Sequence, residues 1–412
     1  MSLPTAPSPI VRLLVALALI TFGSSAIYVV VVVLPEIQRE FGIARADASL
    51  PYTMTMIGFG IGGIFMGRMA DRIGVMVPVL IGSVGMGAGY LVAAQATSLD
   101  TFAAAHGLLL GLIGSSALFS PLLADISLWF TKRRGIAVAI CACGNYLAGA
   151  IWPPIVQPLM DSFGWRTAYN WLGLSCFVVM VPLSTLLRHR PAATPAIASP
   201  AAIEAAPSHD GRAIVLPKSQ LQWLICIAGL ACCVAMAMPQ VHIVAYCADL
   251  GFGVARGAQM LALMLAFGIA SRLLFGLICD RIGGVRTLLL GSILQGVSLV
   301  LYLGFDSLAS LFLISAIFGL FQGGIVPSYA IIVRESFPPS EAGFRIALAM
   351  TATMLGMALG GWISGKIFDL TGSYQAAFIN GIGWNLLNLA IATYLLWCTR
   401  GIRWPGQRPA VQ

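Results

Sequence analysis

The chain has 412 residues, of which 59% are hydrophobic and only 9% are charged. A soluble domain carries about 25% charged residues, so this composition excludes a water-soluble globular protein and indicates one that lies in lipid. The formal net charge of +8 would suit a nucleic-acid-binding protein, but the basic residues form short clusters between apolar runs. We therefore expect the lipid bilayer as the partner of the chain and no nucleic acid.

The apolar runs are long enough to cross a membrane, which takes about 20 residues per helix. The first run, from Val11 to Leu34, is longer than the hydrophobic region of a signal peptide and is predicted to remain as a span. In chain order the predicted spans are residues 11–34, 49–68, 76–96, 101–130, 136–159, 167–187, 220–248, 257–279, 286–304, 309–333, 345–367 and 374–398. The predicted fold class is an all-α polytopic membrane protein with twelve transmembrane helices.

The segment between the sixth and seventh spans has a different composition. Residues 191–219 are rich in Pro and Ala with interspersed polar residues, and such a segment cannot bury enough apolar area to fold. We predict a cytoplasmic linker here, between an N-terminal six-helix bundle at 1–190 and a C-terminal six-helix bundle at 220–412.

The distribution of Lys and Arg predicts the orientation, because these residues concentrate in cytoplasmic loops. With the N-terminus inside, most of the 23 Lys and Arg residues fall on the cytoplasmic side, and Arg272 falls within a span. The exceptions that fall outside are Arg39, Arg45, Arg166, Arg256 and Lys366. Short tails and the lack of an organelle-targeting segment predict a multi-pass protein of the bacterial cytoplasmic (inner) membrane, with both termini cytoplasmic.

The two halves repeat one motif with the spacing G-x-x-x-D-R-x-G. It runs from Gly67 to Gly74 after the second span and from Gly276 to Gly283 after the eighth. A second echo pairs Asp161 and Gly164 with Asp369 and Gly372. Repetition of this kind predicts two pseudo-repeat bundles, as in many transporters.

The motif glycines suit a tight turn between helices, and its charged residues are predicted to act in gating. Pairs across the two bundles at the cytoplasmic surface would stabilise one closed state. Loop charges that merely follow the orientation rule would account for the arginines but not for the aspartates or the repeated spacing. The predicted gating residues are Asp71, Arg72, Asp280 and Arg281.

Two copies of this motif in a six-plus-six chain resemble the major facilitator superfamily. Within it, Trp129-Phe-Thr-Lys-Arg-Arg-Gly135 followed by Cys143-Gly-Asn145 is similar to the pattern of monocarboxylate porters and oxalate/formate antiporters, as is Ser271-Arg-Leu-Leu-Phe-Gly276. The resemblance implies the major facilitator fold, transport by alternating access and no enzymatic activity. It also implies a carboxylate-binding arginine in the eighth span, at the position of Arg272.

Arg272 is the strongest candidate for a substrate ligand. It lies about 12 Å from the cytoplasmic loop and therefore near the middle of the membrane. An arginine there is costly unless it faces a wet cavity or an anion, and it cannot deprotonate. Its planar fork matches a carboxylate through two parallel hydrogen bonds. Fixation by backbone carbonyls or by a neighbouring carboxylate is the competing interpretation, but no other span carries a mid-span Asp or Glu.

Weaker candidates surround it. Asn145 and Gln322 lie at mid-depth and are expected to bind a substrate hydroxyl or carbonyl, with helix-to-helix bonding as the alternative. Tyr28 and Tyr329 are expected to present hydroxyl groups. His242 is a candidate carrier of a coupling proton, with a solvated histidine near the mouth as the alternative. Asp125, at the cytoplasmic end of the fourth span near Lys132 and Arg133, is expected to be a gate partner.

These observations predict a secondary active transporter for a small organic anion, most simply a monocarboxylate, since one buried cation favours one carboxylate. A proton or a counter-anion is the expected coupling partner, and the chain is expected to function as a monomer without cofactor or metal. The alternatives are a proton-coupled efflux antiporter for drug-like or other small molecules and a membrane sensor on the same fold. A buried arginine argues against the transport of cations.

Overall fold

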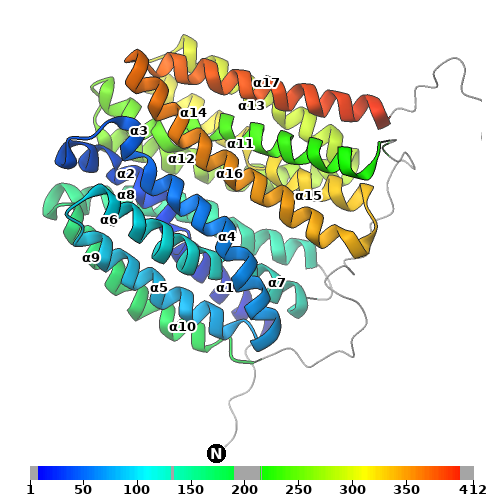
Figure 1. Ribbon diagram of the computed structural model, residues 1–412, viewed down its shortest axis with the longest axis horizontal. Helices are drawn as coiled ribbons and strands as arrows, with labels where there is room; N and C mark the ends of the chain where they lie inside the picture. Colours follow the sequence, from blue (N-terminus) through cyan, green and yellow to red (C-terminus); the bar gives the residue numbers. More distant parts are fainter. Residues whose placement is uncertain (1–7, 131–133, 190–213, 215, 400–412) are drawn as a thin grey trace, which may run out of the picture.

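The computed structural model describes residues 8–130, 134–189, 214 and 216–399 (Figure 1). Within these residues, 12 helical segments are long and apolar enough to cross a membrane, as predicted. In the first half, span one is α1 (Pro9–Gly23) with α2 (Ser25–Phe41), span two is α3 (Arg45–Ala48) with α4 (Leu50–Ile73), and span three is α5 (Met76–Ala94). Span four is α6 (Leu99–Ala104) with the π-helix η1 (Ala105–Ser115) and α7 (Ser120–Trp129), and span five is α8 (Arg134–Phe163). Span six is α9 (Trp165–Ser175) with the π-helix η2 (Cys176–Met180) and α10 (Val181–Thr185).

The second half repeats this order with fewer interruptions. Its spans are α11 (Lys218–Asp249), α12 (Val254–Ile282), α13 (Gly284–Gly304), α14 (Leu308–Gln322) with α15 (Ile325–Ser336), α16 (Pro339–Thr371) and α17 (Tyr374–Thr399). Most of the predicted linker, 191–219, lies outside the described residues, and α11 begins at Lys218, within its predicted C-terminal end.

The repeated motif is more helical than predicted. Helix α4 continues to Ile73 and α12 to Ile282, so the acids Asp71 and Asp280 lie in the last turn of a helix and not in a loop. Only the final glycine of each copy leaves the helix, with φ of +91° at Gly74 and +80° at Gly283. A side chain would be strained in that conformation, so the last glycine sets the turn and the first one does not.

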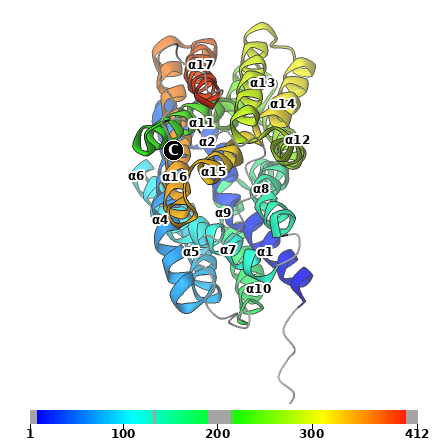
Figure 2. The same cartoon turned by 90° about the vertical axis from the view of Figure 1, so that its right-hand side faces the viewer.

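The two halves lie side by side, with α1 to α10 in one and α11 to α17 in the other (Figures 1 and 2). They touch where α3 and α4 meet α16 and where α8 meets α12. Glycine permits these close approaches: a Cβ atom added at Gly365 would lie 2.9 Å from the Cα atom of Ala46, and one at Gly361 would lie 3.2 Å from the ring of Tyr52. Small residues at helix contacts are typical of membrane bundles.

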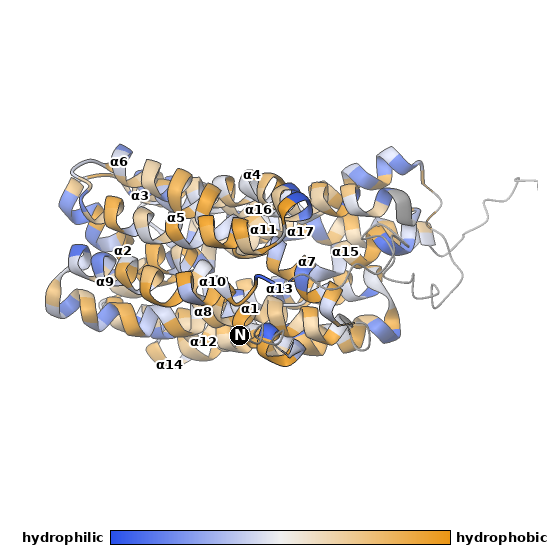
Figure 3. Cartoon of the chain, turned by 90° about the horizontal axis from the view of Figure 1, so that it is seen from below, coloured by the Kyte–Doolittle hydropathy of each residue, from blue (hydrophilic) through white to orange (hydrophobic). Residues whose placement is uncertain are grey.

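The outside of the bundle is apolar. Large hydrophobic side chains such as Phe344 (76% exposed), Trp223 (65%) and Leu277 (64%) point away from the protein. Hydrophilic residues gather at the ends of the helices, and hydrophobic ones along their length (Figure 3). Such a surface is stable in hydrocarbon and not in water, so the chain is a multi-pass membrane protein.

The molecule has two distinct ends. We call the end at which α17 finishes the termini end, on the right of Figure 1, and the end that carries α3 the opposite end, on the left. Antiparallel neighbours bring the motif residues 67–74 and 276–283 to the termini end, whereas Arg45 and Asp249 lie at the opposite end.

Candidate functional site

Arg272 lies at the contact between the two halves, on α12 facing α8. Its Nη1 atom donates to the carbonyl oxygen of Ala142 at 2.8 Å, and its guanidinium lies over the ring of Tyr146 at 4.4 Å from the ring centre. The Nε atom is buried and has no hydrogen-bond partner. Among the described residues it forms no ion pair, so the positive charge has no carboxylate to neutralise it.

The residue one turn before this arginine is a glycine that faces an aromatic ring. A Cβ atom added at Gly268 would lie 3.3 Å from the ring of Tyr146. The aromatic ring therefore occupies the space into which a longer side chain at position 268 would extend. Tyr146 was not predicted from the sequence, although it follows Asn145 directly and could have been found from its mid-span position.

Tyr28 and Asn145 come together as partners beside this arginine helix. The Tyr28 hydroxyl donates to Asn145 Oδ1 at 2.8 Å, and Asn145 Nδ2 donates to Ser24 Oγ at 3.3 Å. Ser24 stands at the break between α1 and α2. The two predicted residues thus join the first and fifth spans, one position along α8 from Tyr146.

Gln322 ends α14 at the break in the tenth span. It is completely buried, and its Oε1 atom accepts a hydrogen bond from Gln240 Nε2 at 2.8 Å, while its own Nε2 has no partner. The next residue, Gly323, packs against Ser271, since a Cβ atom there would lie 2.8 Å from Ser271 Cβ. Gln322 is therefore near the turn of α12 that carries Arg272. Gln240, a polar residue within an apolar run, was missed.

Tyr329 lies apart from these residues. It is fully buried, and its hydroxyl contacts the carbonyl oxygen of Ala228 at 3.0 Å and Asn388 Oδ1 at 2.9 Å. Both contacts are inside the second half, where they join α15 to α11 and α17. The structure therefore places Tyr329 in the interior of that half and does not bring it to Arg272.

The four motif charges make no contact across the halves in this conformation. Asp71, Arg72, Asp280 and Arg281 are exposed, and none forms an ion pair with another described residue. The predicted pairs at the termini end are therefore absent from this state of the protein.

Asp125 has a partner that the sequence did not indicate. Arg12 donates from Nε and Nη2 to its two oxygens at 2.6 and 2.9 Å, and from Nη2 to the carbonyl oxygen of Leu187 at 3.2 Å. By its place in the sequence Arg12 counts toward the charges of the cytoplasmic side, but it is only 1% exposed and lies over the ring of Trp129. This pair joins α1, α7 and the end of the sixth span within one half, so the described contacts do not make Asp125 a gate partner. Lys132 and Arg133, expected near it, lie outside the described residues.

Breaking this buried pair should destabilise the first half strongly. Asp125→Asn leaves the Arg12 charge buried without a counter-ion, which we expect to cost about 3–5 kcal/mol, whereas Arg12→Met combined with Asp125→Leu should restore most of the loss. Thermal melting in detergent tests this. Glu36→Gln, which removes an exposed pair with Arg39, is the control and should melt like the wild type. An Asp125→Asn protein of wild-type stability would contradict the assignment.

At the opposite end, a single arginine of the first half is bound by several residues of the second. Arg45 Nη1 and Nη2 donate to Asp249 at 3.0 and 3.2 Å, and Nη1 also donates to the Tyr374 hydroxyl at 2.6 Å. The guanidinium lies 4.5 Å from the ring centre of Phe368, and the side chain is only 10% exposed. The sequence indicated Arg45 only as an external loop charge.

Asp369 completes this junction from α16. Its two carboxylate oxygens accept hydrogen bonds from the backbone amides of Arg45 and Ala46, both at 2.8 Å. These amides lie at the start of α3, where the N–H groups have no acceptor within the helix. An acid of one half therefore caps a helix of the other. We call Arg45, Asp249, Asp369, Tyr374 and His242 the Arg45 cluster.

His242 is not the solvated residue near the mouth that was considered as an alternative. It is 0% exposed, with Nε2 at 2.8 Å from the carbonyl oxygen of Gly361 and Nδ1 at 3.3 Å from the Tyr374 hydroxyl. It therefore belongs to the Arg45 cluster through its contact with Tyr374.

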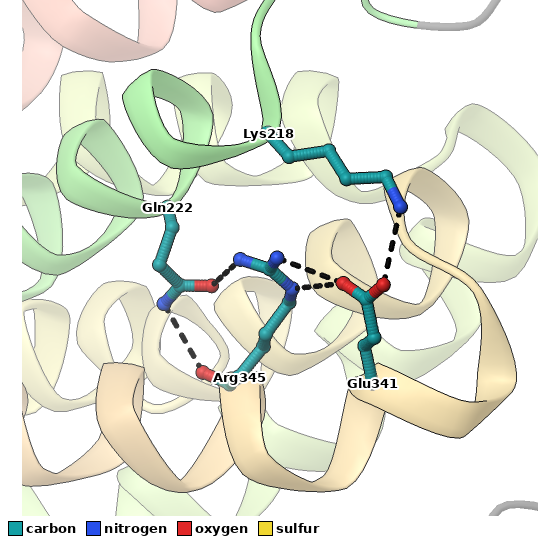
Figure 4. Close-up of polar contacts among 4 residues, drawn as sticks. All are labelled: Lys218, Gln222, Glu341 and Arg345. Atoms are coloured by element: carbon teal, nitrogen blue, oxygen red, sulfur yellow. Dashed lines mark hydrogen bonds and ion pairs between the residues drawn. The ribbon is translucent and has the colours of Figure 1, made fainter.

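The termini end has polar contacts of a different kind. Arg345 donates from Nη2 to Glu341 at 2.8 Å, Lys218 donates to Glu341 at 3.2 Å, and Gln222 donates to the Arg345 carbonyl at 3.2 Å (Figure 4). These residues join α11 to α16 inside the second half. The ion pairs and hydrogen bonds between halves that the described residues make lie instead at Arg272, at Thr53 and in the Arg45 cluster.

Twelve membrane-length helices in two six-helix halves that repeat each other, with an arginine at their contact that has no carboxylate partner among the described residues, are the arrangement of a multi-pass membrane transporter. The family model described as Major Facilitator Superfamily matches residues 13–297 and 260–407. The chain therefore belongs to that superfamily, as the repeated motif predicted.

Relatives and solved structures agree with this assignment. The chain is 27% identical to "MFS-type transporter pynF" of Aspergillus niger, over 81% of this chain and 75% of that protein. It is 26% identical to "Monocarboxylate transporter 13" of Rattus norvegicus, over the same shares. Its fold is similar to a crystal structure of a bacterial homolog of the human lysosomal transporter Spinster, in an inward-facing and unoccupied conformation, with a TM-score of 0.70, 14% identity and 96% of both chains covered. That likeness concerns the fold alone.

Proposed function

We propose that the protein is a secondary transporter for a small organic anion, most simply a monocarboxylate, and that Arg272 binds the carboxylate. The observation that carries this proposal is the environment of Arg272. Its charge stands at the junction of the two halves, where the described residues offer it a carbonyl oxygen and an aromatic ring but no carboxylate, and leave its Nε without a partner.

Such an arginine is costly in the membrane unless an anion compensates it. One carbonyl satisfies one of its five donors, and the ring face adds a modest cation–π attraction. A substrate carboxylate would take two of the remaining donors in parallel and neutralise the charge. The second hydrogen of Asn145 Nδ2 and the free Nε2 of Gln322 are the donors that we assign to the rest of the substrate, and the Tyr28 oxygen, whose proton goes to Asn145, is an acceptor for it.

Alternating access supplies the transport mechanism. In this conformation the halves are held together at the opposite end by the Arg45 cluster, while the polar contacts at the termini end stay within one half. The predominance of Lys and Arg at the termini end favours a cytoplasmic location for it, and so an inward-facing state. Rocking of the halves would break the Arg45 cluster and bring the charges of the two motifs together.

Uptake of labelled monocarboxylates, dicarboxylates and organic cations into proteoliposomes tests the proposal. We expect accumulation or exchange of monocarboxylates, weaker transport of dicarboxylates because the site has one cation, and none of organic cations because Arg272 repels them. Transport of cations without any transport of acids would contradict the proposal and favour the efflux antiporter.

A further inference from the structure

The contacts of His242 determine which of its nitrogen atoms carries a proton. Arg45 Nη1 has only hydrogens to offer, so the Tyr374 oxygen must accept at their 2.6 Å contact. The Tyr374 hydroxyl proton is then free to donate to His242 Nδ1, at 3.3 Å. His242 Nε2 lies 2.8 Å from a carbonyl oxygen, that of Gly361, and must donate to it. With a proton on Nε2 and the Tyr374 hydroxyl donating to Nδ1, the contacts fit a neutral ring.

A polar cavity connects this chain of hydrogen bonds to the opposite end of the molecule. It measures about 390 Å³ and is lined by residues that include Tyr374, Asp249, Asp306 and Tyr246. Tyr246 is nine-tenths buried and its hydroxyl has no hydrogen-bond partner in the described part of the chain. A cavity of this size and polarity has room for water, which would reach Tyr374 on the side away from His242.

We propose that His242 is a proton-binding site, filled from the opposite face through Tyr374, and that a proton bound there releases the Arg45 cluster. This inference rests on the proposed transport function in one respect, namely that the proton bound at His242 is the ion whose movement is coupled to that of the anion. Its structural part, opening of the opposite end on protonation, needs no substrate.

The transfer is balanced by a relay. A hydronium ion in the cavity gives a proton to the Tyr374 oxygen, the original hydroxyl proton of Tyr374 passes to His242 Nδ1, and water remains in the cavity. Tyr374 is again a neutral phenol and His242 is an imidazolium. The new Nδ1–H then points at the same oxygen to which Arg45 already donates.

This product conflicts with the closed arrangement. Two cations, imidazolium and guanidinium, would share one phenol oxygen in a buried site where like charges repel strongly. The carboxylates nearby are already engaged, Asp249 by the Arg45 side chain and Asp369 by backbone amides. The titratable and charged groups around His242 are Tyr374 on α17, Arg45 on α3, Tyr52 on α4, Asp369 on α16, and Tyr246 and Asp249 on α11.

The sign of the effect follows from linkage. The closed end requires neutral His242, whereas the open end exposes a histidine to water, where it titrates at about pH 6.5. Acidification below this pH therefore increases the population that is open at the opposite end, whereas a rise in pH above it leaves that population unchanged. One proton per opening gives at most about a tenfold shift per pH unit, so the open population should rise roughly tenfold between pH 8 and pH 5.5.

Distances between spin labels in lipid nanodiscs measure this shift without substrate. Labels at Asp100→Cys in the first half and Ser307→Cys in the second report on the opposite end, since both positions are exposed there. A Cys398→Ser background removes the one native cysteine of the described chain that is not buried. We expect the wild type to open on acidification and His242→Gln, which keeps a donor for Gly361 but cannot titrate in this range, to show no pH response.

Two further variants control the result. His106→Gln removes another fully buried histidine, which contacts Thr55 and Tyr169 within the first half, and should leave the pH response intact. Tyr374→Phe removes the relay oxygen and should abolish the response while the halves remain folded. A wild type that does not open on acidification, or a His242→Gln protein that responds like the wild type, would overturn the inference. Loss of anion transport alone would instead concern the proposed function.

Discussion

Replacement of Arg272 by alanine should reduce kcat/KM for the transported anion by about tenfold to a hundredfold, the equivalent of a charge-assisted hydrogen-bonded contact. Arg272→Lys should recover part of this loss, because it restores the charge without the planar fork. Initial rates of uptake into proteoliposomes measure the effect. Each variant should lower kcat/KM by a similar factor for monocarboxylates of different chain length, since all of them present the same carboxylate.

Arg256→Ala is the matched control for this experiment. Arg256 lies on the same helix, α12, but is exposed near the opposite end, where it donates to Gln259. Its loss should leave kcat/KM near the wild-type value. Equal effects of the two alanine variants, or a normal rate for Arg272→Ala protein that is correctly folded, would rule out Arg272 as the carboxylate ligand.

The fold was predictable because membrane insertion leaves a strong periodic signal in the sequence. Each span must satisfy its backbone groups internally and present apolar side chains to lipid, which produces long apolar runs separated by polar loops. The ends of the spans were less well predicted. Helices α4 and α12 run through the Asp-Arg pairs, because these charges lie at the aqueous end of a helix and do not terminate it.

The polar contacts at the centre could be predicted only in part. Arg272, Asn145 and Gln322 stand out in the sequence as polar residues within apolar runs. Their partners do not, since the carbonyl of Ala142 and the ring of Tyr146 contact Arg272 only because α8 crosses α12 at that level. Tyr329 resembles Tyr28 in the sequence, as a tyrosine within an apolar span, but its hydroxyl contacts residues inside its own half.

The Arg45 cluster shows why junctions between halves are hidden in a sequence. Arg45 and Asp369 are separated by most of the chain, and each resembles a solvated loop charge by its local context. Only their positions on α3 and α16, facing each other at the opposite end, reveal a pair. Arg12 and Asp125 illustrate the same limit within one half, where a terminal arginine proves to be buried.

Arg45→Ala should shift the protein toward a state that is open at the opposite end. The substitution removes the two hydrogen bonds to Asp249, the bond to Tyr374 and the contact with Phe368. Charge-assisted bonds contribute about 1.5–3 kcal/mol, so the closed-to-open ratio should fall about tenfold to a hundredfold. Distances between labels at Asp100→Cys and Ser307→Cys measure the ratio at pH 8, where His242 is neutral.

Two further variants are expected to open this end to a smaller degree than Arg45→Ala or not at all, which makes the test specific. Asp249→Asn should open the end less than Arg45→Ala does, because the Asp249 side chain is 37% exposed and water replaces part of its interaction. Arg166→Ala also removes an arginine of the opposite end, but its partner Glu40 lies in the same half, so the distances should not change. If all three variants opened the end equally, loss of surface charge would account for the result. If Arg45→Ala left the distances unchanged, helix packing between the halves, of α3 and α4 against α16 and of α8 against α12, would be enough to hold them together, and the Arg45 cluster would have no part in alternating access.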